Sequence, residues 1–161
     1  MYHTGVLFKF RYYLSLEDNL LFNYASTMLY FRPHHFLCTL GFQGLGYSPA
    51  FVENYKDIVT QLLAPNGDEV IIQVVKHTDS ICSPCPHKRE QLCKYQAKID
   101  RLDHAHGQAL GIRVGDKITW GQAKERIAQH ISIKVFHEIC SSCSWKSLGV
   151  CEQALTNLHN R

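Results

Sequence analysis

The stretch Cys82-Ser83-Pro84-Cys85, followed by seven residues and then Cys93, is the one around which this chain is organised. Its spacing recurs in Cys140-Ser141-Ser142-Cys143, followed by seven residues and then Cys151. Two residues between the first two cysteines let both sulfurs turn toward one point, as a tetrahedral metal or the corner of a cluster requires. We call these the first triplet (Cys82, Cys85, Cys93) and the second triplet (Cys140, Cys143, Cys151), and two copies in one short chain predict a metal site.

The number of cysteines also bears on the compartment of the protein. The chain has seven of them in 161 residues, and its first residues do not form a secretory signal. An odd number that includes two Cys-x2-Cys pairs favours metal binding in a reducing cytosol over a secreted disulfide framework. We therefore expect a cytoplasmic protein.

Length and composition predict one ordinary globular domain, with 45% hydrophobic and 19% charged residues. The net charge of +3 comes without a dense stripe of Lys and Arg, which argues against a nucleic-acid partner. No apolar run is long enough to span a bilayer, so no membrane partner is expected.

Residues 1–27 differ from the rest of the chain. They are rich in Tyr, Phe, Leu and Asn and show no clean helical or strand period. We interpret them either as an N-terminal extension that precedes a true start at Met28, or as an added element that packs on the domain. Residues 28–161 would then form the cysteine-rich metal-binding domain.

The predicted fold is α+β and mainly helical, a single small domain with one short strand pair and two loop–helix units formed by the triplets. A helix from Pro33 to about Leu40 places His34 and Cys38 on one face. Ser48 and Pro49 begin an amphipathic helix that runs to Leu63. The apolar run 70–75 predicts a buried strand, paired with a segment near 117–119 or with one in the extension.

The C-terminal half is predicted to be helical between its cysteine loops. Helices are expected from about Cys93 to Leu110 with Gly111 as the cap, from a capping box at Thr119 to about His130, and from Ser132 toward Cys140. Cys151 is expected to begin the last helix, so both third cysteines would open a helix.

The six cysteines of the triplets can be used in several ways. Two separate sites would each need a fourth ligand, and a single site would take two cysteines from each triplet. The candidate additional ligands are Cys38, His34, His35, His87 and His137. Zinc would brace the fold, whereas an iron–sulfur cluster would add redox chemistry. Apolar neighbours such as Trp145, and the proline after Cys85, favour the cluster.

The segment Arg32–Cys38 is a second constellation. One of its histidines with Cys38 could complete a metal site or form a Cys–His nucleophile pair, and the alternative is a helix that merely packs its apolar residues inward. A nucleophile is the weakest reading, because no Asn or Asp is obviously placed to orient the base. A metal-dependent enzyme that uses His34 or His35 stays open, so the sequence does not decide whether the protein is an enzyme.

Several motifs occur here in a familiar order: Arg32–Cys38, Gly46–Pro49, Phe51–Asn54, Asp79–Cys82 and Cys140–Trp145. Over about residues 29–159 the chain resembles the small bacterial and archaeal proteins of domain-of-unknown-function family 1284 (DUF1284). Members of that family begin just before the Arg-Pro-His-His motif, which agrees with a start at Met28.

The resemblance implies iron–sulfur binding, since members are often labelled as iron–sulfur binding proteins, but it supplies no substrate. Some members lack the equivalent of Cys85, which points to Cys82, Cys93, Cys143 and Cys151 as the core ligands, with Cys140 as an addition. We expect a small iron–sulfur protein for electron transfer or redox sensing, with a redox partner protein. The alternative is a zinc-stabilised interaction module without redox activity.

Overall fold

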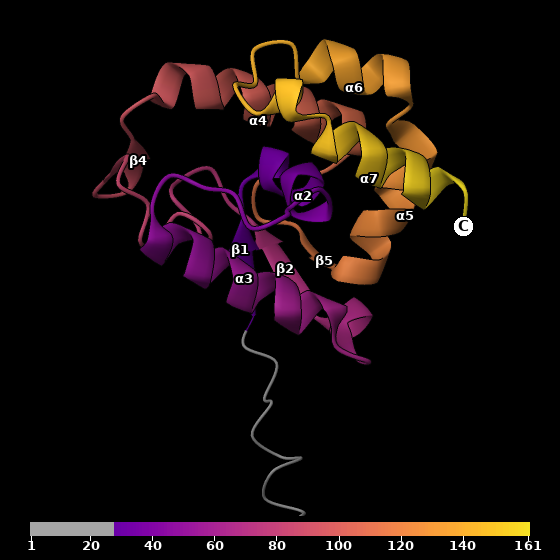
Figure 1. The fold of residues 1–161 in the computed structure, drawn as a ribbon, viewed down its shortest axis with the longest axis horizontal. Helices are drawn as coiled ribbons and strands as arrows, with labels where there is room; N and C mark the ends of the chain where they lie inside the picture. The colour runs from indigo at the N-terminus through magenta and orange to yellow at the C-terminus, as the bar shows by residue number, and fades with distance from the viewer. Residues whose placement is uncertain (1–27) are drawn as a thin grey trace, which may run out of the picture.

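The computed structural model describes residues 28–161, which form a single α+β domain that is mainly helical (Figure 1). Residues 1–27, and with them both interpretations of an N-terminal extension, lie outside the described residues. The helices are α2 (Pro33–Leu40), α3 (Pro49–Leu63), α4 (Gln96–Leu110), α5 (Trp120–His130), α6 (Ile133–Ile139) and α7 (Val150–His159). Within the described part, no helix is both long and apolar enough to cross a membrane.

The central sheet has three short strands, one more than the predicted pair. They are β1 (Leu29–Phe31), β2 (Ile71–Val74) and β5 (Lys117–Thr119), with β2 in the middle. The expected partner 117–119 is confirmed and runs antiparallel to β2, whereas β1 runs parallel to it. The chain leaves β1 and enters α2 after one residue, so the sheet fixes where α2 begins.

Helix α2 lies in the middle of the domain, between α3 below and α4, α6 and α7 above in Figure 1. It packs against α4 and against α7. Its Phe36 and Leu37 are buried and join one continuous hydrophobic core with residues of the sheet and of α3, α5 and α7. Both its sequence neighbours and its distant partners therefore hold this short helix in place.

The helix ends follow the predicted caps. The side chain of Ser48 accepts a hydrogen bond from the backbone N–H of Phe51, and Thr119 with Gln122 forms a complete capping box. Ser132 caps α6, and Gly111 ends α4 in the left-handed conformation at φ 63°. These local signals confirm the predicted boundaries of α2, α3, α5 and α6.

The prediction that Cys93 opens a helix is wrong. Cys93 lies in β4 (Leu92–Cys93), which pairs with β3 (Lys88–Arg89) in a small hairpin, and α4 begins three residues later at Gln96. The backbone N–H of Cys93 donates to the side chain of Gln96 at 2.9 Å. By contrast, Cys151 does lie in the first turn of a helix, α7. The two triplets therefore do not share one structural plan.

Candidate metal centre

Six of the seven cysteines line one open cavity of about 490 Å³. They come from separate parts of the chain: α2, the loop after β2, β4, the loop after α6, and α7. The six are Cys38, Cys82, Cys85, Cys93, Cys143 and Cys151. The structure thus brings the first triplet, two members of the second triplet, and Cys38 to one space.

On one side of the cavity, Cys38 lies near the thiols of the second triplet. Burial raises the pKa of Cys38, and the nearby thiols of Cys151 and Cys143 raise it further. Burial likewise raises the pKa of Cys151 to about 11, with a smaller contribution from Cys143. Such closely spaced thiols would lose their protons only when a bound cation compensates the charge, which is the chemistry of a metal site.

Gly41 explains how α7 comes so close to the end of α2. A methyl group on Gly41 would lie 2.8 Å from both the Cα and the Sγ atoms of Cys151. Contacts of that length do not occur, so only glycine lets the first turn of α7 approach here. The position of Cys151 in the cavity wall therefore depends on Gly41.

The first triplet forms the other side. The backbone N–H of Cys85 donates to the carbonyl of Cys82 at 3.0 Å, which closes the turn between them. Burial raises the pKa of Cys85, and the thiol of Cys93 adds to that shift. The sulfur of Cys93 accepts a hydrogen bond from the backbone N–H of Tyr95 at 3.5 Å.

Cys140 does not line the cavity. Its sulfur lies 3.5 Å from Nε2 of His106, whose Nδ1 lies 2.7 Å from the carbonyl oxygen of Leu102. Because a carbonyl only accepts, Nδ1 carries the proton, and Nε2 accepts from the Cys140 thiol. Burial is also the main cause that raises the pKa of Cys140 to about 12. In this arrangement Cys140 is a hydrogen-bonded core thiol that turns away from the other cysteines.

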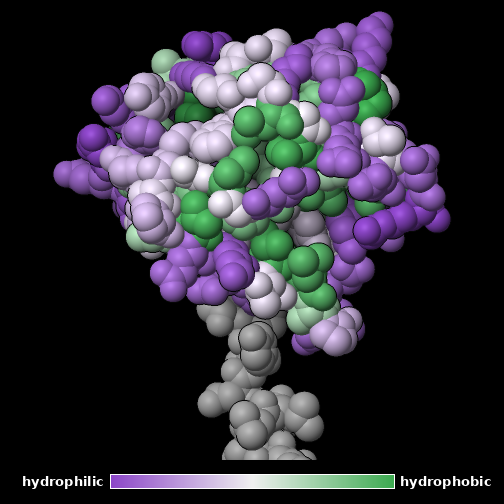
Figure 2. All heavy atoms as spheres, viewed as in Figure 1, coloured by the Kyte–Doolittle hydropathy of each residue, from purple (hydrophilic) through white to green (hydrophobic). Residues whose placement is uncertain are grey.

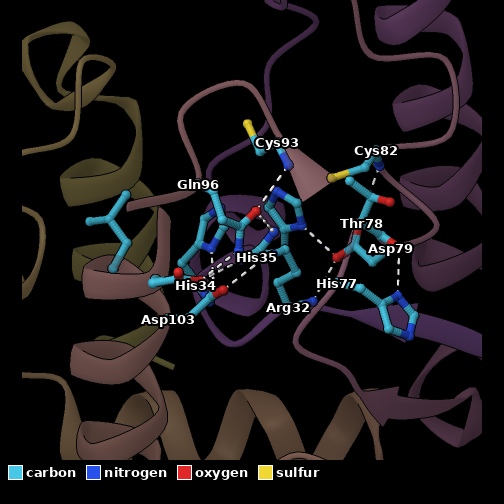
Figure 3. A network of polar contacts seen from close by, with 12 residues as sticks. Arg32, His34, His35, His77, Thr78, Asp79, Cys82, Cys93, Gln96 and Asp103 are labelled. Carbon is cyan, nitrogen blue, oxygen red and sulfur yellow. Dashed lines mark hydrogen bonds and ion pairs between the residues drawn. The ribbon is translucent and has the colours of Figure 1, made fainter. Parts of the chain in front are cut away.

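His34 and His35 also line the cavity, and each is held by a carboxylate (Figure 3). Nδ1 of His34 lies 2.5 Å from Asp103, and Nδ1 of His35 lies 2.6 Å from Asp79. The absence of an obvious Asp to orient a histidine, inferred from the sequence, is therefore corrected. Asp79 comes from the loop after β2 and Asp103 from α4, so only the tertiary fold makes these pairs.

Arg32 completes this network from the N-terminal end of α2. Its side chain is almost fully buried, and its Nε atom donates to Asp103 at 2.7 Å. Its backbone N–H donates to Asp79 at 2.6 Å. Burial alone would raise the pKa of Asp103, but the hydrogen bond from His34 and the charge of Arg32 outweigh it, so the pKa lies below its usual value. Asp103 is therefore ionised at neutral pH.

Sequence reasoning missed Asp79 and Asp103 as site residues. Asp79 had one local signal: its Oδ1 atom accepts hydrogen bonds from the backbone N–H groups of Ile81 and Cys82, two and three residues later, as in an Asx turn. Asp103 had none, because its partners Arg32 and His34 are about seventy residues away.

The remaining histidine candidates are in different places. His87 lines the cavity and packs edge-on against Tyr47 and Tyr95. His137 lies 3.4 Å from Glu152 on the surface and does not line the cavity. As expected, His104 is exposed and His106 is buried.

Polar contacts join the two halves of the cavity near its rim. The indole N–H of Trp145 donates to the hydroxyl of Tyr47 at 2.9 Å, and Lys98 donates to Ser144 at 2.8 Å. Leu45 and Leu148 line the cavity and are about half exposed. Figure 2 shows hydrophobic residues gathered across the middle of the face where Figure 1 shows α2, with polar residues around them.

Comparison with known proteins gives one match. The family described as "Protein of unknown function (DUF1284)" matches residues 46–149. That range contains the first triplet, and it leaves Arg32–Cys38 and Cys151 outside. Neither the curated proteins nor the solved structures contain a match to this chain.

Proposed function

The chain belongs to the DUF1284 family, and from that premise we propose that it binds an iron–sulfur cluster in the cysteine-lined cavity. Cys38, Cys143 and Cys151 would supply ligands from one side, and the first triplet would supply the remainder from the other. When bound, the cluster would carry an electron, so the proposed role is electron transfer or redox sensing in the cytoplasm.

The observation that carries this proposal is the presence of six thiols around one cavity without any three close together. Zinc bound by four thiolates at 2.3 Å needs sulfurs only about 3.8 Å apart. Among the described residues, the one group of three metal-binding side chains whose ligand atoms all lie within 4.8 Å of one another is His35, Asp79 and Cys82. A cluster with several irons is larger than a single ion and suits the wider spacing of the thiols.

The surroundings of the cavity support a redox centre. Phe42, Ile99 and Val150 line it together with the cysteines, and such apolar cover restricts water and tunes the potential of a cluster. The half-exposed Leu45 and Leu148 near the opening would let a redox partner protein approach the centre.

Structural zinc is the second candidate, favoured by one specific observation. In both triplets the fourth residue of the Cys-x2-Cys sequence donates its N–H to the carbonyl of the first at 3.0 Å, from Cys85 to Cys82 and from Cys143 to Cys140. Such tight turns suit a tetrahedral ion. In this reading the protein would be a zinc-stabilised interaction module without redox activity.

The deciding experiment uses protein purified without oxygen, with a visible absorption spectrum and iron, sulfide and zinc analysis of the same sample. A brown protein with matched iron and sulfide that bleaches on reduction is expected. A colourless protein with stoichiometric zinc would replace the first proposal with the second. Cys140→Ser serves as a matched control, because its sulfur faces His106 and the variant should keep its iron, whereas Cys143→Ser should lose it.

A further inference from the structure

His34 and His35 form a matched pair whose geometry is not explained by a cysteine-bound cluster. Their ring centroids are 4.2 Å apart, and each Nδ1 atom lies against a carboxylate from a different element. In Figure 3 both rings lie between these carboxylates and the sulfurs of Cys82 and Cys93.

The carboxylates fix which nitrogen of each ring carries the proton. Asp79 accepts hydrogen bonds from the backbone N–H groups of Arg32, Ile81 and Cys82, and three such donors favour its ionised form. Asp103 is ionised beside Arg32. An ionised carboxylate only accepts, so both Nδ1 atoms carry hydrogen and both Nε2 atoms keep a lone pair. Burial, with a smaller effect of His35, also lowers the pKa of His34 to about 4, which keeps that ring neutral.

Both Nε2 atoms are open to the cavity. No described residue hydrogen-bonds to either of them, and no buried side-chain nitrogen or oxygen in the described part lacks a partner. Both residues line the cavity. Two neighbouring lone pairs in one cavity call for an electron-pair acceptor placed between them.

We infer that His34 and His35, together with the thiol of Cys82, bind one transition-metal ion of the zinc and ferrous class, at a site separate from the cluster. Neutral imidazole and thiolate are preferred ligands of these ions, and a ligating histidine commonly donates its other N–H to a carboxylate. The sulfur of Cys82 lies within 4.8 Å of a ring nitrogen of His35. Three protein ligands leave a fourth position for water or a substrate, and Cys85 and Cys93 remain for the cluster.

Asp79 itself is not a ligand in this site. Its oxygen lies 2.6 Å from Nδ1 of His35, whereas two ligands at about 2.0 Å from a tetrahedral ion would be about 3.3 Å apart. The short distance is a direct hydrogen bond, so the carboxylate orients the histidine and the ion lies on the opposite side of the ring.

The test is zinc uptake by the full chain with His34→Asn and His35→Asn combined. The amide nitrogen of Asn takes the place of Nδ1 and keeps the hydrogen bond to each carboxylate, but nothing replaces Nε2. The matched control is His104→Asn, since His104 is exposed on α4. Each protein is prepared without oxygen, equilibrated with Zn²⁺, freed of excess metal, and analysed for zinc, iron and sulfide.

The double variant is expected to hold about one zinc fewer per chain than the unchanged protein and the control, with equal iron and sulfide. X-ray absorption at the zinc edge should show nitrogen ligands at about 2.0–2.1 Å that the double variant loses. Equal zinc in all three proteins would overturn the inference. So would a parallel loss of iron and sulfide in the double variant, because the histidines would then serve the cluster. Absence of iron from all three would instead refute the proposed function, while the difference in zinc would still decide this site.

Discussion

Asp79 is a fully buried carboxylate that connects three parts of the site. Its two oxygens accept hydrogen bonds from the N-terminal end of α2, from His35, and from the backbone before and at Cys82. Burial by itself would raise the pKa of Asp79, but His35 and the backbone donors outweigh it and lower the pKa. The charge is thus stabilised by its neighbours, and those neighbours are in turn positioned by the charge.

Asp79→Asn is expected to lower the free energy of unfolding by about 3 kcal/mol, because a neutral amide leaves buried donors without a full acceptor. Chemical denaturation of the purified variant measures this. Asp57→Asn, an exposed position on α3, is the matched control and should change stability by less than about 0.5 kcal/mol. Equal stability of the two variants would contradict the role given to Asp79.

His106 should make stability depend on pH. Burial is the main cause that lowers its pKa below 6.5, so the unfolded chain binds a proton at a higher pH than the folded protein does. The resulting contribution is complete above pH 6.5 and is lost as the pH falls below it, by at most about 1.4 kcal/mol per pH unit. Unfolding curves at pH 7.5 and pH 5 should therefore differ less for His106→Asn than for His104→Asn. An identical pH dependence in the two variants would rule out this contribution.

At the scale of elements, the end of α2 and the first turn of α7 form one side of the cavity. Gly41 ends α2, and the space where its side chain would lie is filled by Cys151. Cys38 lies less than one turn before Gly41. The contact between these two helices therefore sets the distance between two proposed cluster ligands.

Gly41→Ala is expected to reduce iron content as well as stability, since the added methyl group must push Cys151 outward. Overpacking of this kind costs about 1–3 kcal/mol. Gly44→Ala is a useful comparison in the same loop: Gly44 has φ 78° and open space around it, so its replacement strains only the backbone. Iron analysis and thermal unfolding should separate the two, and full iron content in Gly41→Ala would show that this contact does not position a ligand.

The elements that were predicted correctly carry local signals. Ser48, Thr119 and Ser132 each cap a helix through a hydrogen bond to a residue three positions on, which a sequence pattern can reveal. The β3–β4 hairpin carries no such signal. Its turn places Glu90 at φ 52°, a conformation that glutamate seldom adopts, and hydrogen bonds from Thr78 to Glu90 and Gln91 hold it. These distant contacts put Cys93 in a strand instead of a helix.

The candidate site was predictable to a similar extent. Metal-binding spacing identifies the cysteines of both triplets as candidates, because thiolate ligands are recognisable one loop at a time. Spacing does not reveal that Cys38 faces Cys151 or that Cys140 faces His106. Those outcomes depend on how α2, α4 and α7 pack together, and packing is a property of the tertiary structure.

At the scale of the whole molecule, the cavity is enclosed by segments from nearly the full described length of the chain. Loss of bound metal should therefore loosen the domain as a unit. We expect Cys151→Ser and Cys82→Ser each to lose metal and to melt at a lower temperature together, since metal binding and folding are coupled in small sites. Metal analysis and calorimetry provide the measurement. Full metal content with unchanged melting in both variants would refute a shared centre.

A chain that begins at Met28 is expected to fold and to bind the same metal as the full chain. The first strand, β1, starts at Leu29, and every cysteine lies after it. Iron, sulfide and zinc analysis of the shortened protein, with its melting temperature, checks this. Loss of soluble protein on shortening would show that residues 1–27 belong to the core.

The contact between α2 and α7 has a consequence for how the protein is made. Cys38 is synthesised early, whereas Cys151 lies only ten residues before the C-terminal end of this sequence. A ribosome shields the most recently added residues, so Cys151 cannot reach α2 until translation has ended. During synthesis the earlier thiols stand without their partner and are open to oxidation or to the wrong ion. Loading of the centre is therefore a post-translational event, and a cell that delivers metal late would favour the correct product.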